Sequence, residues 1–232
     1  MATDHIVTAP FRLAFPEVFQ AKAAVAGGRE KFSITMLFPK NKVPLIPQLP
    51  GDGILPIRKL LFAAMQETWG PDPTKWPPKI RAIDVANYVS PTGQDGWPIR
   101  DGDLVEWDGF AGCLFVRATS QYPLGIVEGN PLHDVVDKNA VFGGLICRAQ
   151  VNAFSFNNAG NVGVSLGVSN LHILKNDGTM YGGRQNAVDV FDAYAEPGTP
   201  GAPSNDPFGA ATGGTPVGAG AAQTGAPYNP FV

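Results

Sequence analysis

The stretches LICRAQVNAFSF (145–156), NNAG (157–160) and NVGVSLGVSNLHIL (161–174) decide the fold class. Apolar and polar residues alternate along the first and third stretches, and a period of two predicts half-buried β-strands over 139–156 and 162–174. The intervening Asn-Asn-Ala-Gly sequence is typical of a hairpin connection. We therefore predict a long antiparallel hairpin, as expected of a mainly β protein.

The buried parity changes within the second strand of this hairpin. Four apolar residues share one face and two later ones fall on the other, namely Val162, Val164, Leu166 and Val168, then Leu171 and Ile173. Such a change indicates one inserted residue, so we predict a β-bulge near Ser169 and Asn170.

The rest of the head is also mostly β in pattern. Further strands are predicted over 6–19, 31–38, 103–107 and 112–119, with one helix over 57–69 and an irregular Pro/Gly/Trp-rich segment over 71–102. Several short strands, one helix and no βαβ alternation favour a small β-barrel over a parallel α/β sheet.

The C-terminal 40 residues have a different composition. From 193 to 232 the chain is rich in Gly, Pro and Ala, contains no Lys or Arg, and has few large apolar residues. Such a segment buries too little apolar surface to offset the entropy of ordering it, so we predict a disordered tail after a domain over 1–192. Isolated aromatics beside prolines mark a partner-binding role for the tail: Phe208, Tyr228, Pro230 and Phe231.

Composition sets further limits. Hydrophobic residues make up 44% of the chain and the formal net charge is −3, which argues against a protein coated in positive charge. No apolar run approaches the length of a membrane-spanning helix, and the N-terminal sequence lacks the pattern of a signal peptide. Cys113 and Cys147 fall in predicted strands without metal-ligand spacing, which predicts buried reduced thiols.

The predicted strand 145–156 has two different faces. One face is small and apolar, as a core requires: Leu145, Cys147, Ala149, Val151 and Ala153. The other carries Ile146 together with a cation, two amides and two rings: Arg148, Gln150, Asn152, Phe154 and Phe156. Rings stack on bases for about 1–3 kcal/mol each, while cations hold phosphates. The alternative is that both phenylalanines pack under a loop or the helix.

Other candidates come from the strand 112–119 and from the loops, which often carry binding groups. The predicted phosphate contacts are Lys40, Lys42, Arg81, Arg100, Arg117 and Arg148. The predicted stacking residues are Trp76, Trp97, Phe115, Phe154 and Phe156. For the loop tryptophans the alternative is packing onto the core, and for the two lysines it is a solvated turn.

Signals of an enzyme are poor. The histidines have no ligand spacing, and neither a nucleophile elbow nor a phosphate loop occurs. The acidic residues over 95–108 do not match a calcium-loop pattern, although they leave a metal-dependent nuclease open as a rival. We predict no catalytic residues, no metal and no cofactor.

Five short motifs resemble those of bacteriophage single-stranded DNA-binding proteins with an OB fold. They are Phe38-Pro39-Lys40, Arg100-Asp101-Gly102-Asp103, Gly144-Leu145-Ile146-Cys147-Arg148, Asn158…Gly160…Gly163-Val164 and Asp189-Val190-Phe191. Their order and spacing over roughly residues 8–192 carry the resemblance.

The resemblance implies a non-catalytic protein that coats exposed single strands during phage replication, recombination or repair, in the cytoplasm of the infected bacterial host. It also implies that the tail recruits replication proteins. The tail ends Pro230-Phe231-Val232 with few acids, which disfavours electrostatic competition with DNA. Duplex binding and self-association stay open. The main alternative is a phage structural or assembly protein that uses the barrel for protein contacts.

Overall fold

The computed structural model describes residues 5–23, 27–158 and 160–181. Its elements in chain order are β1 (His5–Val7), β2 (Phe11–Ala23), β3 (Glu30–Pro39), α1 (Ile54–Trp69), η1 (Pro73–Lys75), α2 (Pro78–Arg81), β4 (Ile99–Asp101), η2 (Gly102–Leu104), β5 (Cys113–Ser120), β6 (Gly125–Glu128), β7 (His133–Asp134), η3 (Lys138–Ala140), β8 (Ile146–Asn158) and β9 (Asn161–Lys175). Among the described residues, no helix is both long and apolar enough to cross a membrane.

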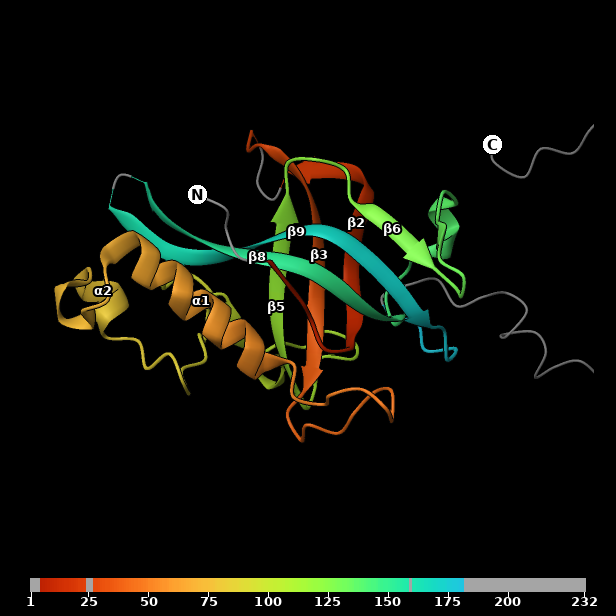
Figure 1. Cartoon of the computed structure of the whole chain (residues 1–232), viewed down its shortest axis with the longest axis horizontal. Helices are drawn as coiled ribbons and strands as arrows, with labels where there is room; N and C mark the ends of the chain where they lie inside the picture. The colour runs from red at the N-terminus through yellow and green to blue at the C-terminus, as the bar shows by residue number, and fades with distance from the viewer. Residues whose placement is uncertain (1–4, 24–26, 159, 182–232) are drawn as a thin grey trace, which may run out of the picture. The chain divides into compact units, whose positions relative to one another are not determined.

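Five of the strands close into a barrel. The circuit runs β8–β2–β3–β5–β9 and returns to β8, with β5 and β9 parallel and every other neighbouring pair antiparallel. β1 pairs with β8, β4 with β5, and the β6–β7 hairpin with β9 through β6. Figure 1 shows the long β8–β9 hairpin crossing in front of β2, β3 and β5. The prediction of a mainly β, OB-like barrel is confirmed.

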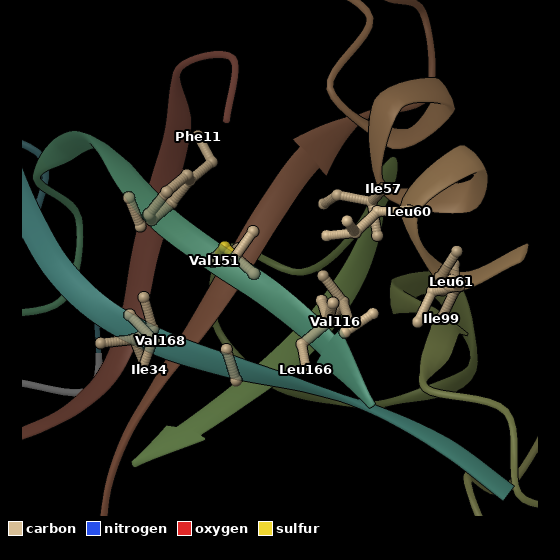
Figure 2. Close-up of a cluster of buried hydrophobic side chains, with 14 of the residues drawn as sticks. Phe11, Ile34, Ile57, Leu60, Leu61, Ile99, Val116, Val151, Leu166 and Val168 are labelled. Atoms are coloured by element: carbon tan, nitrogen blue, oxygen red, sulfur yellow. The ribbon is translucent and has the colours of Figure 1, made fainter. Parts of the chain in front are cut away.

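The barrel core lies between the β8–β9 hairpin and the β2–β3–β5 wall. Val151, Leu166 and Val168 come from the hairpin and face Ile34 and Val116 (Figure 2). Helix α1 adds its own apolar stripe, which includes Ile57, Leu60 and Leu61. Removing these side chains from water supplies the main driving force for the fold.

Most of the predicted local features are confirmed. Asn158 ends β8 and Asn161 begins β9, so the predicted turn closes the hairpin. The neighbours Gln150 and Val151 of β8 pair with Asn170 and Val168 of β9. Ser169 is therefore the extra, unpaired residue of β9, and this is the predicted bulge. The predicted helix over 57–69 is present and begins at Ile54.

Four local predictions were wrong. The single strand expected over 6–19 is divided into β1 and β2. No strand forms over 103–107: the short strand β4 ends before it at Asp101, and the 3-10 turn η2 follows because Asp101 caps it by accepting a hydrogen bond from the Asp103 amide. The strand expected from 139 begins at Ile146. Cys147 is buried as expected, but Cys113 is partly exposed.

Candidate nucleic-acid interface

The outer face of β5 carries the first part of the candidate interface. Val116 and Ala118 point into the main core, whereas Phe115 belongs to a smaller cluster on the outer face and Arg117 is exposed. Strand parity therefore separates the core from the outer wall as predicted.

A hollow of about 280 Å³ lies over this outer wall. It is lined by Thr92, Gly93, Gly96, Trp97, Pro98, Arg100, Arg117, Thr119, Phe156, Val164 and Ser165. Four of the predicted site residues line this hollow: Trp97 from the loop before β4, Arg100 from β4, Arg117 from β5 and Phe156 from β8. Trp97 is buried, so two cations, one accessible ring and several hydroxyls provide the groups that a nucleotide chain needs.

Arg100 is the central cation of the hollow. Its guanidinium carbon lies 4.8 Å from the ring centroid of Phe115 and 5.9 Å from that of Trp107. Its Nε is buried and has no hydrogen-bond partner within the described residues. Gly93 lies directly over the side chain, because a Cβ there would come within 2.9 Å of the Arg100 Cδ. A stacked, partly unsatisfied guanidinium is ready to bind an anion.

Arg117 is the more exposed cation of the pair. Its Nη2 donates to the Ser33 Oγ at 2.9 Å. The nearest carboxylate is Glu17, whose Oε2 lies 3.8 Å from the same nitrogen. An exposed pair at this distance contributes little, so most of the positive charge of Arg117 remains available.

Phe156 closes the hollow from the β8–β9 hairpin. The strand register places it opposite Gly163, and a Cβ on Gly163 would lie 2.5 Å from the ring. Gly96 packs against Gly163, and the Gly96 carbonyl accepts a hydrogen bond from the Val164 amide at 2.9 Å. Because neither glycine has a side chain, the Phe156 ring and the 90–98 loop can both pack against this part of β9. Phe154 shares the outer face of β8 and is 40% exposed, but it does not line the hollow.

Three predicted stacking residues require correction. Trp76, Trp97 and Phe115 are 3%, 1% and 3% exposed, respectively. The indole N–H of Trp76 donates to the Gly70 carbonyl at 2.8 Å, and that of Trp97 to the Tyr88 carbonyl at 3.1 Å. These rings fasten the 71–102 segment to the core and leave no open face for a base. Phe115 instead supports Arg100.

Lys40 and Lys42 lie away from the hollow and are paired with acids. The Lys40 Nζ binds both Asp101 and Asp103, and the Lys42 Nζ lies 2.8 Å from an oxygen of Asp52. Burial alone would lower the pKa of Lys40, but hydrogen bonds to the two carboxylates outweigh it and raise the pKa. The lysine stays charged while its charge is neutralised locally, which argues against a role in phosphate binding.

The remaining two predicted cations are separate from the hollow. Arg81 is exposed in α2 and donates to the Thr74 carbonyl at 3.0 Å. Arg148 lies on the outer face of β8, where its Nε donates to the His172 Nδ1 at 3.1 Å. Burial and the nearby Arg148 charge lower the pKa of His172, so the imidazole is neutral and accepts this bond. The six predicted cations therefore do not form one patch.

Sequence reasoning missed Trp107 and Lys31. The Trp107 ring is 45% exposed beside Arg100, at the end of the segment 103–107 for which the sequence predicts a strand. Lys31 stands directly opposite Lys22 across the β2–β3 pair, and it has the outward parity of Ser33. Lys22 is paired with Glu17, whose Oε1 lies 3.2 Å from the Lys22 Nζ, whereas Lys31 has no ion pair among the described residues. The sequence signal for Lys31 is its position in the strand 31–38. The alternate residues of that strand are all apolar and form the core face, so Lys31 must lie on the outer face.

Three of the five acidic residues over 95–108 are engaged in other contacts. Asp101 and Asp103 bind Lys40, and Asp95 accepts a hydrogen bond from the Tyr88 hydroxyl. Within 5–23, 27–158 and 160–181, no three His, Cys, Asp or Glu side chains gather as metal ligands. The predicted tail residues Phe208, Tyr228, Pro230 and Phe231, and the motif 189–191, lie outside the described residues.

The fold and the outer wall together define an OB-like barrel with a basic and aromatic groove. Residues 4–199 match the family model described as "Enterobacter phage Enc34, ssDNA-binding protein". The chain therefore belongs to the Enc34 single-stranded DNA-binding protein family, which confirms the resemblance seen in the sequence. The family is defined by DNA binding and is not an enzyme class.

Individual proteins share part of the sequence or the fold of this chain. Protein p50 of Acyrthosiphon pisum secondary endosymbiont phage 1 is 25% identical over 181 residues, which cover 78% of this chain and 89% of the relative. The single-stranded DNA-binding protein from bacteriophage Enc34 in complex with ssDNA is 19% identical, covers 75% of this chain and 87% of its own, and superposes with a TM-score of 0.52. Its DNA-free structure gives 20% identity, coverage of 82% and 89%, and the same TM-score. These structural likenesses show that the fold is shared.

Proposed function

We propose that this protein coats single-stranded DNA exposed during phage replication, recombination or repair, without reading its sequence. Membership of the Enc34 family supports this function. The observation that carries the proposal is the hollow lined by Arg100, Arg117 and Phe156, in which Arg100 has no ion pair among the described residues.

The groove lies where an OB barrel binds oligonucleotides. OB folds use the face of their second and third strands with the adjoining loops. In chain order β3 and β5 are the second and third strands of the closed circuit, and Arg117 and Ser33 lie on their outer faces. Outward-facing Lys31 extends the positive charge along β3 towards the β2–β3 connection.

Each group has a physical task. The two arginines neutralise phosphates and release counterions, and every such contact makes binding more sensitive to salt. Phe156 offers a π-face, and every base has one, so stacking tolerates any sequence. The Thr119 and Ser165 hydroxyls line the same hollow and can bond to sugar or phosphate oxygens.

The same arrangement favours unpaired strands over duplexes. Bases in a duplex already stack on their neighbours, so a ring such as Phe156 gains nothing from them. Phosphate contacts alone do not distinguish the two forms, and weak duplex binding through the arginines is therefore expected.

The wider roles follow from the family and from the predicted tail. We place the protein in the cytoplasm of the infected host, with replication proteins as partners of the 193–232 segment. Coating a strand requires no catalytic residue, and we propose none.

A titration of a labelled polythymidine oligonucleotide with the full chain tests the function. Arg100 and Arg117 alone contribute about 1.4 to the slope of log affinity against log salt, at about 0.7 per phosphate contact on single strands. A duplex of equal length is the control and should bind more weakly. Undetectable binding at low salt, or affinity indifferent to salt, would refute the proposal. The assembly-protein alternative predicts that outcome.

A further inference from the structure

Phe15 adopts an unusual backbone conformation in the middle of β2. Its φ is +44°, in a region that bulky residues seldom occupy. The β2–β3 register shifts between Ala14 and Glu17, so Phe15 stands at an irregularity of the strand. Nevertheless its side chain is 49% exposed. A strained residue that presents an apolar ring to solvent indicates a use for that ring.

The ring of Phe15 belongs to a small aromatic group with two layers. Phe110 and Phe115 are buried and form its base, with their centroids 4.9 Å apart. Phe15 and Trp107 are exposed above them, 5.4 Å apart and nearly perpendicular. Phe15 also lies 5.5 Å from Phe110. Phe15 and Trp107, here called the outer aromatic pair, thus pack on a buried aromatic base and remain 49% and 45% exposed, respectively.

The outer aromatic pair adjoins the cation of the proposed groove. Arg100 lies over both Trp107 and Phe115, and it also lines the hollow with Arg117. A phosphate bound by Arg100 would place the next nucleotide beside Trp107. Glu106 and Asp108 flank Trp107 in the chain and are exposed, so this spot disfavours a second phosphate and favours an uncharged ring.

We propose that the outer aromatic pair binds one unpaired nucleobase, stacked on Trp107 with Phe15 against its edge. This subsite rests on the proposed function, because the base must belong to a strand whose phosphate lies at Arg100. It extends the DNA path from the hollow across the outer end of β5 to β2. Any base fits, since recognition uses the π-face alone.

Intrinsic fluorescence provides a direct readout. The chain has four tryptophans, of which Trp76 and Trp97 are buried and Trp69 is partly buried against Trp76. Polythymidine should quench the emission of the full-length protein, and the Trp107→Phe variant should lose most of this quench. A labelled oligonucleotide measures the affinity of both proteins independently. An unchanged quench in the variant would overturn the subsite.

Affinity tests the two rings separately. Trp107→Ala should weaken binding by roughly 5- to 100-fold, the usual range for loss of one base stack. Phe15→Gly removes the other ring but suits the positive φ, so the melting temperature should hold while affinity falls. Tyr122→Ala is the matched control, because Tyr122 is 77% exposed and lies outside the aromatic group.

An abasic scan locates the base. A short oligonucleotide with one abasic position should bind the full-length protein less tightly, and at one position that penalty should vanish in Trp107→Ala. Salt-dependent binding that survives both ring variants unchanged would refute the subsite and leave the proposed function standing. Absence of any DNA binding by the unmodified protein would refute both.

Discussion

Two regions of the barrel surface each contain a pair of predicted phosphate-binding cations. The two pairs differ in the number of carboxylates that contact them. Arg100 and Arg117 line a hollow without a carboxylate among its lining residues, and the ion pair that Arg117 makes within the described residues is with Glu17 at 3.8 Å. Lys40 and Lys42 lie near α1, where three carboxylates bind them: Asp52, Asp101 and Asp103. Both regions look equally basic when the lysines and arginines alone are counted.

The comparison shows that available charge, rather than the presence of a cation, distinguishes a binding surface from a structural one. A phosphate arriving at Lys40 must displace two carboxylates that already satisfy the ammonium. A phosphate arriving at Arg100 instead meets a guanidinium that has no ion pair within the described part of the chain. No existing carboxylate has to be displaced there, so the full charge-assisted contact is available to DNA.

The largest effect is expected from replacing both arginines of the hollow. Arg100→Ala combined with Arg117→Ala should weaken binding to polythymidine by about 100-fold or more, since each charge-assisted contact contributes about 1.5–3 kcal/mol. The salt slope should fall by about 1.4. Fluorescence anisotropy at several salt concentrations measures both quantities.

A variant with the same loss of charge provides the control. Lys59 and Arg81 are exposed and lie outside the hollow, so Lys59→Ala with Arg81→Ala should retain nearly full affinity. Equal losses of affinity in the two double variants would mean that only the net charge of the protein matters. The hollow would then have no special role in binding.

Phe156 should give the next largest effect. Phe156→Ala removes one stacking face and should weaken binding by roughly 10-fold, within the 1–3 kcal/mol observed for such losses. Phe156→Trp keeps an aromatic face and should bind nearly as well. Phe154→Ala, on the same face of β8 but outside the hollow, should have the smaller effect. A larger loss of affinity in Phe154→Ala than in Phe156→Ala would mean that the DNA follows β8 at Phe154 instead of the hollow.

Lys40 should contribute to DNA binding once the two carboxylates that pair with it are made neutral. Asp101→Asn with Asp103→Asn keeps the hydrogen-bond acceptors and frees Lys40, which should tighten binding by about 2- to 5-fold at low salt and steepen the salt slope by up to about 0.7. Lowering the pH from 7 to 5 should not reproduce this gain, because the hydrogen bond from Lys40 lowers the pKa of Asp103. Affinity that stays unchanged in the double variant would show that Lys40 lies too far from the DNA path.

Patterns of period two predicted the barrel wall well. The two faces of β8, the two faces of β5 and the bulge at Ser169 all follow from local alternation, which depends on neighbours along one strand. For that reason Arg117 and Phe156 could be placed on the outside from sequence alone. The β6–β7 hairpin was not predicted, because its strands are too short to show a period.

Long-range packing could not be predicted in the same way. Nothing local distinguishes Trp97, whose indole N–H finds a backbone carbonyl, from Trp107, which remains exposed. Likewise, Asp101 and Asp103 lie some 60 residues after Lys40 in the chain. The β3–β5 and β4–β5 pairings bring these side chains together, and only the assembled sheet shows that the lysine is neutralised.

The smallest effect is expected from removing the two lysines. Lys40→Gln combined with Lys42→Asn should change the affinity for polythymidine by less than about twofold, since their charges are already balanced. Asn suits the positive φ of +57° at position 42. Exposed ion pairs contribute about 0–1 kcal/mol each, so the melting temperature should fall only slightly. A tenfold loss of affinity would mean that phosphate displaces the carboxylates on binding. The acidic neighbours would then modulate phosphate binding by the lysines rather than prevent it. The two regions would not differ in their ability to bind DNA.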